Sequence, residues 1–218
     1  MKRDRIILLA RAPIPGRVKT RLSPWVDAAT AAQLHVALVR DACELLLSFR
    51  DLADIELCLD GPSDVWAAYG FAQTLQIEGS LGDRMHAALS RAIHSGYRQA
   101  VLIGSDSPGL PATHIRSLLD LDTDAALGPA EDGGYYAIKC RRVHPAMFDG
   151  VRWSTSDALA DTADALARCG LTVATGPRWF DIDQPSDVLS LAARPGLPRH
   201  AASWIQAHVR NSALAPIG

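Results

Sequence analysis

The sequence predicts an α/β protein, built on a mainly parallel β-sheet with helices on both of its faces. Short apolar runs alternate with stretches of helical periodicity almost to the end of the chain. The chain has 218 residues, 48% hydrophobic and 21% charged, so it can bury one large core. Loops rich in Gly, Pro, Asp and basic residues follow several apolar runs, where ligands of open α/β sheets bind.

The apolar runs predict strands at residues 5–10, 55–60, 74–78, 100–104, 125–128, 135–139 and 171–175. The stretches between them predict helices at residues 27–50, 64–69, 81–95, 113–121, 156–169 and 186–193. Gly96 and Gly170 each follow a helix where a left-handed C-cap is expected. The segment PGLPR then breaks the pattern, and residues 201–210 predict one further helix. We therefore expect a main domain over residues 1–194, with residues 195–218 forming a C-terminal helix and tail packed on it.

Charge and composition exclude several classes of protein. The formal net charge of −2 gives no field that would attract nucleic acid or an anionic membrane surface. The apolar run from Ile6 to Ala10 is much too short for a signal-peptide core or a membrane span. The four cysteines lie far apart, without metal-binding spacing, and are expected to be reduced thiols of a cytoplasmic protein.

The loop after the first predicted strand carries four cations. ARAPIPGRVKTRL contains Arg11, Arg17, Lys19 and Arg21, together with Gly16. Glycine lets backbone amides approach a phosphate, and the cations supply charge, so the loop predicts a nucleotide polyphosphate site. A solvated basic loop is an equally good account of the residues alone. It is not a P-loop, because the second glycine of that motif is absent.

Carboxylates follow two other predicted strands. Asp106, in VLIGSDSPGLP, lies at a strand's carboxyl end and could hold Mg²⁺ or Mn²⁺ against a diphosphate, although an Asx-turn or helix cap would also explain it. In WFDIDQPSDV, Asp181 and Asp183 alternate with apolar residues and are expected on one face of a strand. One of these two could complete the metal site, and Asp183 is preferred because it lies at the strand exit.

The remaining polar loops predict an acceptor site and a further nucleotide contact. In GPAEDGGYYAI, Asp132, Gly133 and Gly134 could bind an acceptor, although Asp-Gly is also a hairpin signal. The weaker motif VRWSTSD offers Trp153, Ser154 and Thr155 to the acceptor, with a helix cap beside a buried Trp as the alternative. In SLGDRM, Gly82 and Arg84 lie at a helix start, where capping and a surface cation are competing explanations.

Taken together, RAPIPGRVKTRL, SLGDRM, GSDSPGLP, GPAEDGGYY, RWSTSD and FDIDQPSDV resemble a known family over about residues 6–188. The chain is similar to nucleotide-diphospho-sugar-transferase-like proteins of the GT-A fold, which include glycosyltransferases of unknown function and radical-SAM/selenodomain-associated transferases. It is also similar to phospholactate guanylyltransferase, to molybdenum-cofactor nucleotidyltransferase-like proteins and, in its late acidic run, to cytidylyltransferases. The resemblance implies a three-layer α/β/α GT-A fold with a mainly parallel mixed sheet, and makes residues 1–194 the catalytic domain.

The resemblance also implies roles for individual residues. It places Arg11, Gly16, Lys19 and Arg21 at the nucleotide, and Asp106 and Asp183 at the metal. From the motifs themselves we add Ala12, Gly82 and Arg84 at the nucleotide. The motifs likewise assign the acceptor to Asp132, Gly133, Gly134, Trp153, Ser154 and Thr155. Lys19, Asp106, Asp132 and Asp183 would carry the catalysis. Two departures stand out. Ser107 and Pro108 follow Asp106, so the acid-x-acid signature is missing, and the strand after Gly134 ends in Lys139 and Cys140 rather than in apolar residues.

Two reactions fit these residues. In glycosyl transfer, the metal would neutralise a departing nucleoside diphosphate while a small-molecule acceptor attacks the sugar. In nucleotidyl transfer, Lys19 and Arg21 would stabilise the α-phosphate while a phosphate or carboxylate acceptor displaces pyrophosphate. The basic loop favours nucleotidyl transfer and the family resemblance favours glycosyl transfer, which is our narrow preference. A non-catalytic nucleotide-binding protein is the third hypothesis. The C-terminal helix could cover a second subunit, so a homodimer is also considered.

Overall fold

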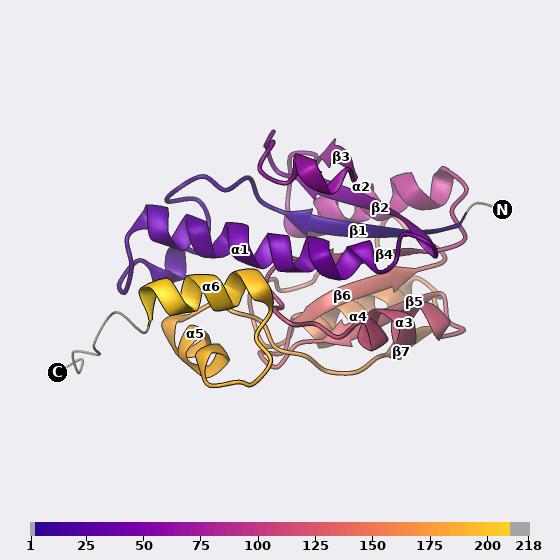
Figure 1. Ribbon diagram of the computed structural model, residues 1–218. Helices are drawn as coiled ribbons and strands as arrows, with labels where there is room; N and C mark the ends of the chain where they lie inside the picture. The colour runs from indigo at the N-terminus through magenta and orange to yellow at the C-terminus, as the bar shows by residue number, and fades with distance from the viewer. Residues whose placement is uncertain (1–2, 210–218) are drawn as a thin grey trace.

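The computed structural model describes residues 3–209, which form a mixed sheet in the strand order β3-β2-β1-β4-β6-β5-β7 (Figure 1). β6 runs antiparallel to β4 and β5, and the other neighbouring strands are parallel. This arrangement confirms the predicted mainly parallel mixed sheet. The strands are β1 (Asp4–Ala10), β2 (Ala53–Leu59), β3 (Ala72–Leu75), β4 (Ala100–Gly104), β5 (Ala125–Pro129), β6 (Tyr135–Cys140) and β7 (Val173–Thr175).

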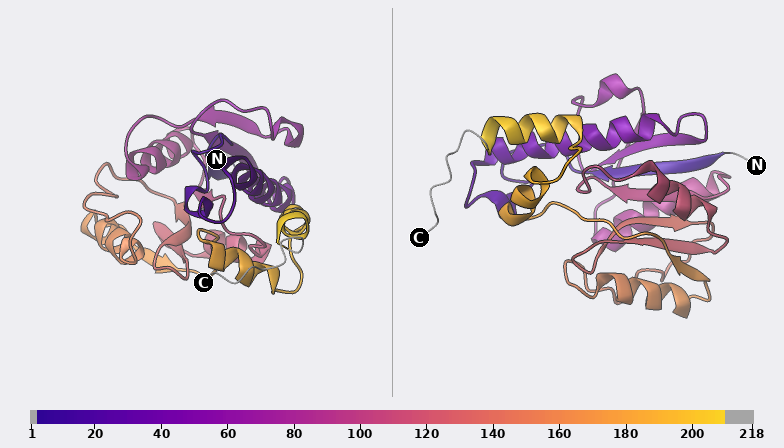
Figure 2. Two further views of the ribbon diagram at one scale, coloured as in Figure 1. Left: turned by 90° about the vertical axis from the view of Figure 1, so that its left-hand side faces the viewer. Right: turned by 60° about the horizontal axis from the view of Figure 1, so that its bottom comes forward.

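Helices cover both faces of the sheet, as alternation along β1 requires. Ile6 and Leu8 pack in one buried cluster with residues of α1 and α3, whereas Ile7 packs in another with residues of α2 and α4. Figure 2 shows α2 and α4 on the side of the sheet opposite to α1. The helices are α1 (Ala28–Leu47), α2 (Leu81–His94), α3 (Ala112–Asp120), α4 (Ala158–Arg168), α5 (Pro185–Ala192) and α6 (Arg199–His208).

A third apolar cluster lies beyond the sheet, where α6 runs along α1 and beside α5 (Figure 1). Trp204 of α6 is buried there, and its indole nitrogen donates to the Thr30 carbonyl at 3.1 Å. The division of the chain at residue 194 stays a prediction. Residues 210–218 of the predicted tail, and the last residue of the helix predicted at 201–210, lie outside the described residues.

Two predicted elements, the helix at residues 64–69 and a strand through Asp181 and Asp183, were wrong, and the edge strand predicted at residues 74–78 was displaced. Residues 64–69 form only a short 3-10 turn, Ala67–Tyr69, which Gly70 ends in a left-handed conformation. The edge strand is β3, which ends before Gln76. Residues 180–183 form no strand, because their backbone bonds elsewhere: the Ile182 amide donates to the Asp106 carbonyl, and the Asp183 amide donates to the side chain of Asp187, which caps α5.

The predicted glycine C-caps agree with the structure. Gly96 and Gly170 have positive φ angles of 87° and 69° directly after α2 and α4. The four cysteines are unpaired, and three of them are buried. Within residues 3–209, no helix combines the length and the apolar character that a membrane span needs.

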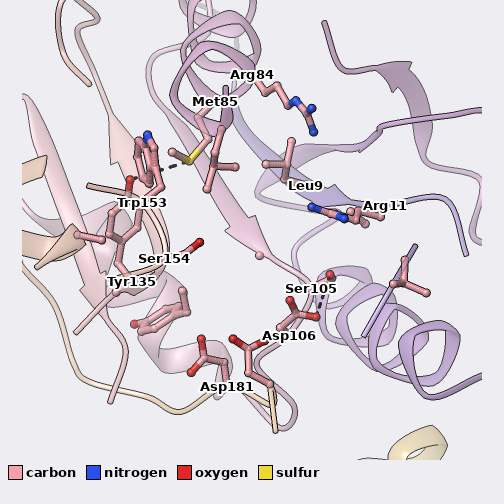
Figure 3. Close-up of a pocket in the computed structure, with 18 of the residues that line it drawn as sticks. Leu9, Arg11, Arg84, Met85, Ser105, Asp106, Tyr135, Trp153, Ser154 and Asp181 are labelled. Atoms are coloured by element: carbon pink, nitrogen blue, oxygen red, sulfur yellow. Dashed lines mark hydrogen bonds between the residues drawn. The ribbon is translucent and has the colours of Figure 1, made fainter. Parts of the chain in front are cut away.

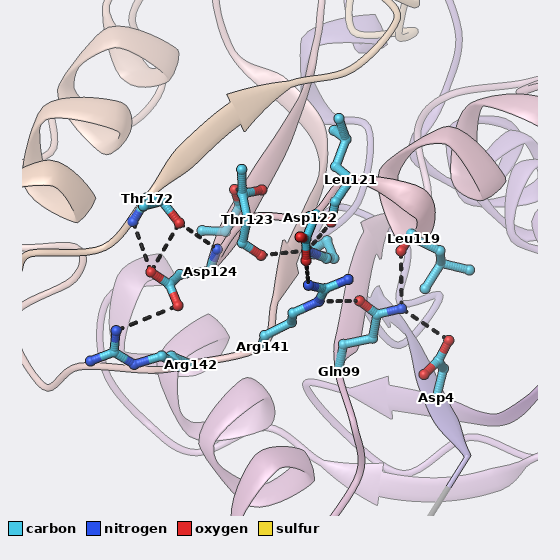
Figure 4. A network of polar contacts seen from close by, with 12 residues as sticks. Asp4, Gln99, Leu119, Leu121, Asp122, Thr123, Asp124, Arg141, Arg142 and Thr172 are labelled. Carbon is cyan, nitrogen blue, oxygen red and sulfur yellow. Dashed lines mark hydrogen bonds and ion pairs between the residues drawn. The ribbon is translucent and has the colours of Figure 1, made fainter.

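The end of the sheet away from the β1 and β4 carboxyl ends holds a polar network (Figure 4). Gln99 bridges Asp4 and Arg141, at 3.0 and 3.2 Å. Fully buried Lys139 donates to the carbonyl oxygens of Leu121 and Thr123 at 2.9 and 2.7 Å. This network explains why a cation lies near the end of β6, where apolar residues were expected, since Lys139 satisfies backbone groups that precede β5.

Lys139 makes stability depend on pH. Burial lowers the pKa of Lys139 from 10.5 to about 8, so the unfolded chain binds this proton more tightly than the folded protein does. Stability should therefore rise, through this group, as pH increases from 8 to 10.5, by on the order of 1–3 kcal/mol. Urea unfolding at pH 8 and pH 10.5 measures this effect. Between these pH values, we expect the free energy of unfolding to rise less in the Lys139→Met variant than in the wild type. An equal rise in both proteins would contradict the lowered pKa of Lys139.

Candidate active site

The basic loop folds so that its lysine, not its arginines, enters the protein. Lys19 has a left-handed backbone conformation, with φ of 49°, and precedes a short 3-10 turn, Thr20–Leu22. Its side chain is only 4% exposed, and its Nζ lies 2.7 Å from Asp106 Oδ1 and also donates to the carbonyl of Ile182. Arg11 and Arg21 are exposed. The loop therefore presents a buried ammonium group, held by Asp106 and the Ile182 carbonyl, together with exposed guanidinium groups.

Asp106 and Asp183 both approach the Lys19 ammonium group. Asp106 follows β4 at the carboxyl end of the sheet, and Asp183 Oδ1 lies 3.9 Å from the same Nζ. Asp183 is also bound by Arg21, at 2.8 Å. The backbone hydrogen bond from Ile182 to Asp106, at 2.9 Å, fixes the two segments against each other. Both carboxylates remain accessible, with side chains 42% and 41% exposed.

Two carboxylates of the cavity, Asp106 and Asp181, have opposite pKa shifts. Partial desolvation in the cavity would raise the pKa of Asp106, but the Lys19 ammonium outweighs this effect, so the pKa lies below its usual value. Burial, with the neighbouring carboxylates of Asp132 and Asp183, raises the pKa of Asp181 to about 7. The site thus holds an ionised acid at its lysine and a second acid crowded by like charge.

These groups line a cavity of about 580 Å³ at the carboxyl ends of β1 and β4, a volume suited to a small ligand (Figure 3). Of the residues predicted from the sequence, eleven line it: Arg11, Lys19, Arg21, Arg84, Asp106, Asp132, Gly134, Trp153, Ser154, Thr155 and Asp183. Four others are not among its lining residues: Ala12, Gly16, Gly82 and Gly133. Ala12 donates its amide to Asp60 at 2.6 Å, and a side chain at Gly82 would meet Phe148 and Trp153.

Aromatic and hydroxyl side chains form one end of the cavity. Trp153 packs edge-on against Tyr135, with ring centroids 6.4 Å apart, and Ser154 lies beside them (Figure 3). Ser154 has a φ of 61°, and among the described residues it and Lys19 are the non-glycine residues with positive φ. Such strain persists where the surroundings fix it, often at functional sites. Asp132 belongs to the β5–β6 hairpin turn, where its carboxylate accepts from the Gly134 amide at 2.8 Å.

Several lining residues were missed as site residues by the sequence reasoning. Leu81 and Met85 of α2 line the cavity, and so does Gln76, directly after β3. Leu81 and Met85 belong to the SLGDRM segment, but apolar side chains at a helix start have many uses, and so does a lone amide after an edge strand. Asp181, which was the less favoured of the two late acids, lies in the cavity as well (Figure 3).

Two glycines of the predicted site provide a matched stability test. Gly133 has a φ of 90°, and an added Cβ would lie 2.2 Å from the Ser156 carbonyl oxygen. Gly16 has a φ of 79° but has no atom within 4 Å of that position. We expect Gly133→Ala to lower the free energy of unfolding by roughly 2 kcal/mol or more, and Gly16→Ala by about 1 kcal/mol. Urea midpoints measure both, and a larger loss in Gly16→Ala would contradict this geometry.

A second group of possible metal ligands lies outside this cavity. Asp41 and Glu44 of α1 approach His200 of α6, and their ligand atoms lie within 4.8 Å of one another. Asp41 accepts from the amides of His200 and Ala201, each at 2.8 Å, and His200 bonds Glu44 at 2.7 Å. These bonds cap and anchor α6, so the group has a structural explanation.

The fold and the cavity define the chain as a member of the GT-A-like class, with the fold of nucleotide-diphospho-sugar transferases. A crystal structure from Desulfovibrio desulfuricans, provisionally described as a nucleotide-diphospho-sugar transferase, matches 97% of this chain and 98% of its own, with 32% identity and a TM-score of 0.81. The chain belongs to the family described as "Uncharacterized protein conserved in bacteria (DUF2064)", whose model matches residues 35–155. The structural match and the family match together confirm the resemblance predicted from the motifs.

More distant structures share the fold alone. One is a CMP:2-keto-3-deoxy-manno-octonic acid synthetase complexed with CTP, which has 14% identity and a TM-score of 0.57 and is matched over 88% of this chain and 98% of its own. Another is the inositol-1-phosphate CTP transferase of T. maritima, with 12% identity, a TM-score of 0.55 and coverage of 93% and 96%. Among curated proteins, no match to this sequence was found.

Proposed function

We propose that this protein is a metal-dependent glycosyltransferase, which moves a sugar from a nucleoside-diphosphate donor to a hydroxyl group of a small molecule. The relative from Desulfovibrio desulfuricans, at 32% identity, carries the name of a nucleotide-diphospho-sugar transferase, and this name supports the choice of donor. The choice of acceptor rests on the site itself.

The observation that carries the proposal is the uneven charge along the cavity. The lining cations lie on the first loop and on α2: Arg11, Arg17, Lys19, Arg21 and Arg84. The aromatic end contributes no Lys or Arg to the lining, but it includes Asp132 and faces Asp181. Its lining residues are Asp132, residues 134–138, residues 153–155 and Ala158. A diphosphate therefore suits the first side, whereas a phosphate or carboxylate acceptor would be repelled at the second. A hydroxyl acceptor avoids that repulsion.

Asp106 and Asp183 fit a divalent ion. Both offer accessible carboxylate oxygens, the ligands that Mg²⁺ and Mn²⁺ prefer, and both already converge on one cation, the Lys19 ammonium. When bound there, the ion would neutralise charge on the departing diphosphate. The second acid of the acid-x-acid signature is absent after Asp106. In this proposal Asp183, from a later segment of the chain, serves as the second metal ligand instead.

The chain's own residues account for the rest of the reaction. Arg11, Arg17 and Arg21 hold the diphosphate, and Lys19 donates to it as the bond to the sugar breaks. The acceptor oxygen forms the new bond to the sugar carbon, and its proton passes to a carboxylate at the aromatic end, Asp132 or Asp181. Trp153 and Tyr135 offer faces against which a sugar-like acceptor can pack.

Nucleotidyl transfer remains the second candidate, because one observation favours it. A buried lysine between two aspartates could stabilise the α-phosphate of a nucleoside triphosphate as directly as a β-phosphate. The two reactions differ in their products. Incubated with Mg²⁺ and a small-molecule extract, the protein should form nucleoside diphosphate from a nucleotide sugar. Release of pyrophosphate from a nucleoside triphosphate, with every nucleotide sugar left intact, would overturn the proposal in favour of the second candidate.

A further inference from the structure

Gln76 has its amide orientation fixed by the backbone. It follows β3 directly, and its main-chain amide donates to the Leu59 carbonyl at 2.7 Å. Its Nε2 donates to two carbonyl oxygens at the ends of neighbouring strands, Ala10 at 2.9 Å and Cys58 at 3.0 Å. Only the NH₂ group can satisfy two carbonyls, so the reversed amide would place oxygen against oxygen. The side chain therefore cannot flip without losing both bonds.

The fixed amide leaves one acceptor for a ligand. Gln76 lines the cavity, is half-buried, and its Oε1 accepts no hydrogen bond from any residue in the range 3–209. A partly desolvated acceptor without a partner favours a ligand that brings a donor. Because Nε2 is already used, this position cannot offer a donor in return.

Other residues that line the same cavity suit a nucleobase site. Leu81 lines the same cavity and is 43% exposed, an apolar surface at the start of α2. Arg84 is positioned by a bond from its Nε to the Gly79 carbonyl, at 3.1 Å, and its side chain extends toward Arg11 (Figure 3). The cavity thus combines an apolar surface, a fixed acceptor and a guanidinium donor with the cations proposed to hold the diphosphate.

We propose that Gln76 selects the donor's base, favouring bases with an exocyclic amino group, namely cytosine, adenine or guanine, over uracil and thymine. This inference rests on the proposed binding of a nucleotide donor. An exocyclic amine donates to Oε1. Uracil and thymine carry carbonyl oxygens at that corner, and their ring N–H lies between two carbonyls, one of which would be brought against Oε1.

The first test compares ligands on the unaltered protein. Calorimetric titrations with Mg²⁺ should give at least one of CDP, ADP and GDP an affinity about tenfold or more above those of UDP and dTDP. Removing only the amine, as in IDP against GDP or purine riboside diphosphate against ADP, should weaken the preferred nucleotide by a similar factor. Equal or tighter binding of UDP or dTDP would overturn base selection while leaving the proposed donor class intact. If no diphosphate binds, the proposed function itself fails.

The second test uses the Gln76→Met variant, which keeps the side-chain length and removes the acceptor. Its ratio of affinities between the preferred nucleotide and UDP should fall to near one. Gln73→Met is the matched control, because Gln73 is exposed on β3 and does not line the cavity. The control should keep the wild-type ratio. A folded Gln76→Met variant that retains the wild-type ratio would contradict the proposal. If the variant does not fold, the comparison of ligands on the wild-type protein decides the question.

Discussion

Replacing Asp106 by asparagine should lower turnover by about 10²–10³-fold while leaving the fold intact. The substitution keeps the shape of the side chain, but it removes the charge that lies 2.7 Å from Lys19 Nζ and that would bind the divalent ion. The loss should be mainly in kcat, because the donor's phosphates are also held by arginines of the first loop. Steady-state kinetics with the identified nucleotide sugar would measure it.

Asp122→Asn is the matched control for that experiment. Asp122 has a side chain that is 96% exposed and pairs with Arg141 at the opposite end of the sheet. Its replacement should leave kcat unchanged. If Asp106→Asn and Asp183→Asn both retained full activity and metal affinity, the pocket would not work by the mechanism proposed, and a binding role without catalysis would gain support.

Replacing Lys19 by methionine should have the second large effect, and it should change the protein's response to metal. The ammonium separates Asp106 from Asp183, and without it the like charges of Asp106, Asp181 and Asp183 face one another. Metal-free Lys19→Met should therefore melt at a lower temperature than the wild type, and Mg²⁺ should raise its Tm by more than it raises the wild-type Tm. Donor affinity should fall about 10–100-fold, since a charge-assisted phosphate contact is lost.

Arg142→Met is the matched control for Lys19→Met in the thermal melts. Arg142→Met removes an exposed cation at the far end of the sheet, and its response to Mg²⁺ should match that of the wild type. A Lys19→Met protein with wild-type Tm, wild-type Mg²⁺ response and undiminished donor affinity would show that the lysine is not part of the site.

The sequence predicted the sheet well where burial produces a strong pattern. The central strands β1 and β4 are apolar on both faces, because helices cover both sides, and each was located within a residue or two of its observed bounds. The edge strand β3 is mostly exposed, so it carries little apolar signal, and its predicted range was displaced toward exposed Ile77. The alternation around Asp181 resembles a strand, but that segment is held by backbone bonds to Asp106 and by the cap of α5.

The site was partly predictable for a similar reason. Loops at the carboxyl ends of strands meet in space, so the grouping of Lys19, Asp106 and Asp183 follows from the fold class. The ion pairs of Lys19 with the two aspartates could not be predicted in this way. Nothing in the sequence indicates that the lysine side chain, rather than that of Arg21, would be buried between the acids. Gln76 could not be found from sequence, since its partners are the backbone carbonyls of Ala10 and Cys58, which no residue type reveals.

The central claim, that Asp106 and Asp183 together hold a divalent ion against a nucleotide, can be tested by electron paramagnetic resonance of Mn²⁺ titrated into the protein with a nucleoside diphosphate. We expect the wild type to take up Mn²⁺ much more tightly with the nucleotide than without it. Asp106→Asn and Asp183→Asn should each abolish that gain, and Asp122→Asn should retain it. Undiminished, nucleotide-dependent Mn²⁺ uptake by the Asp106→Asn, Asp183→Asn double variant would contradict the claim.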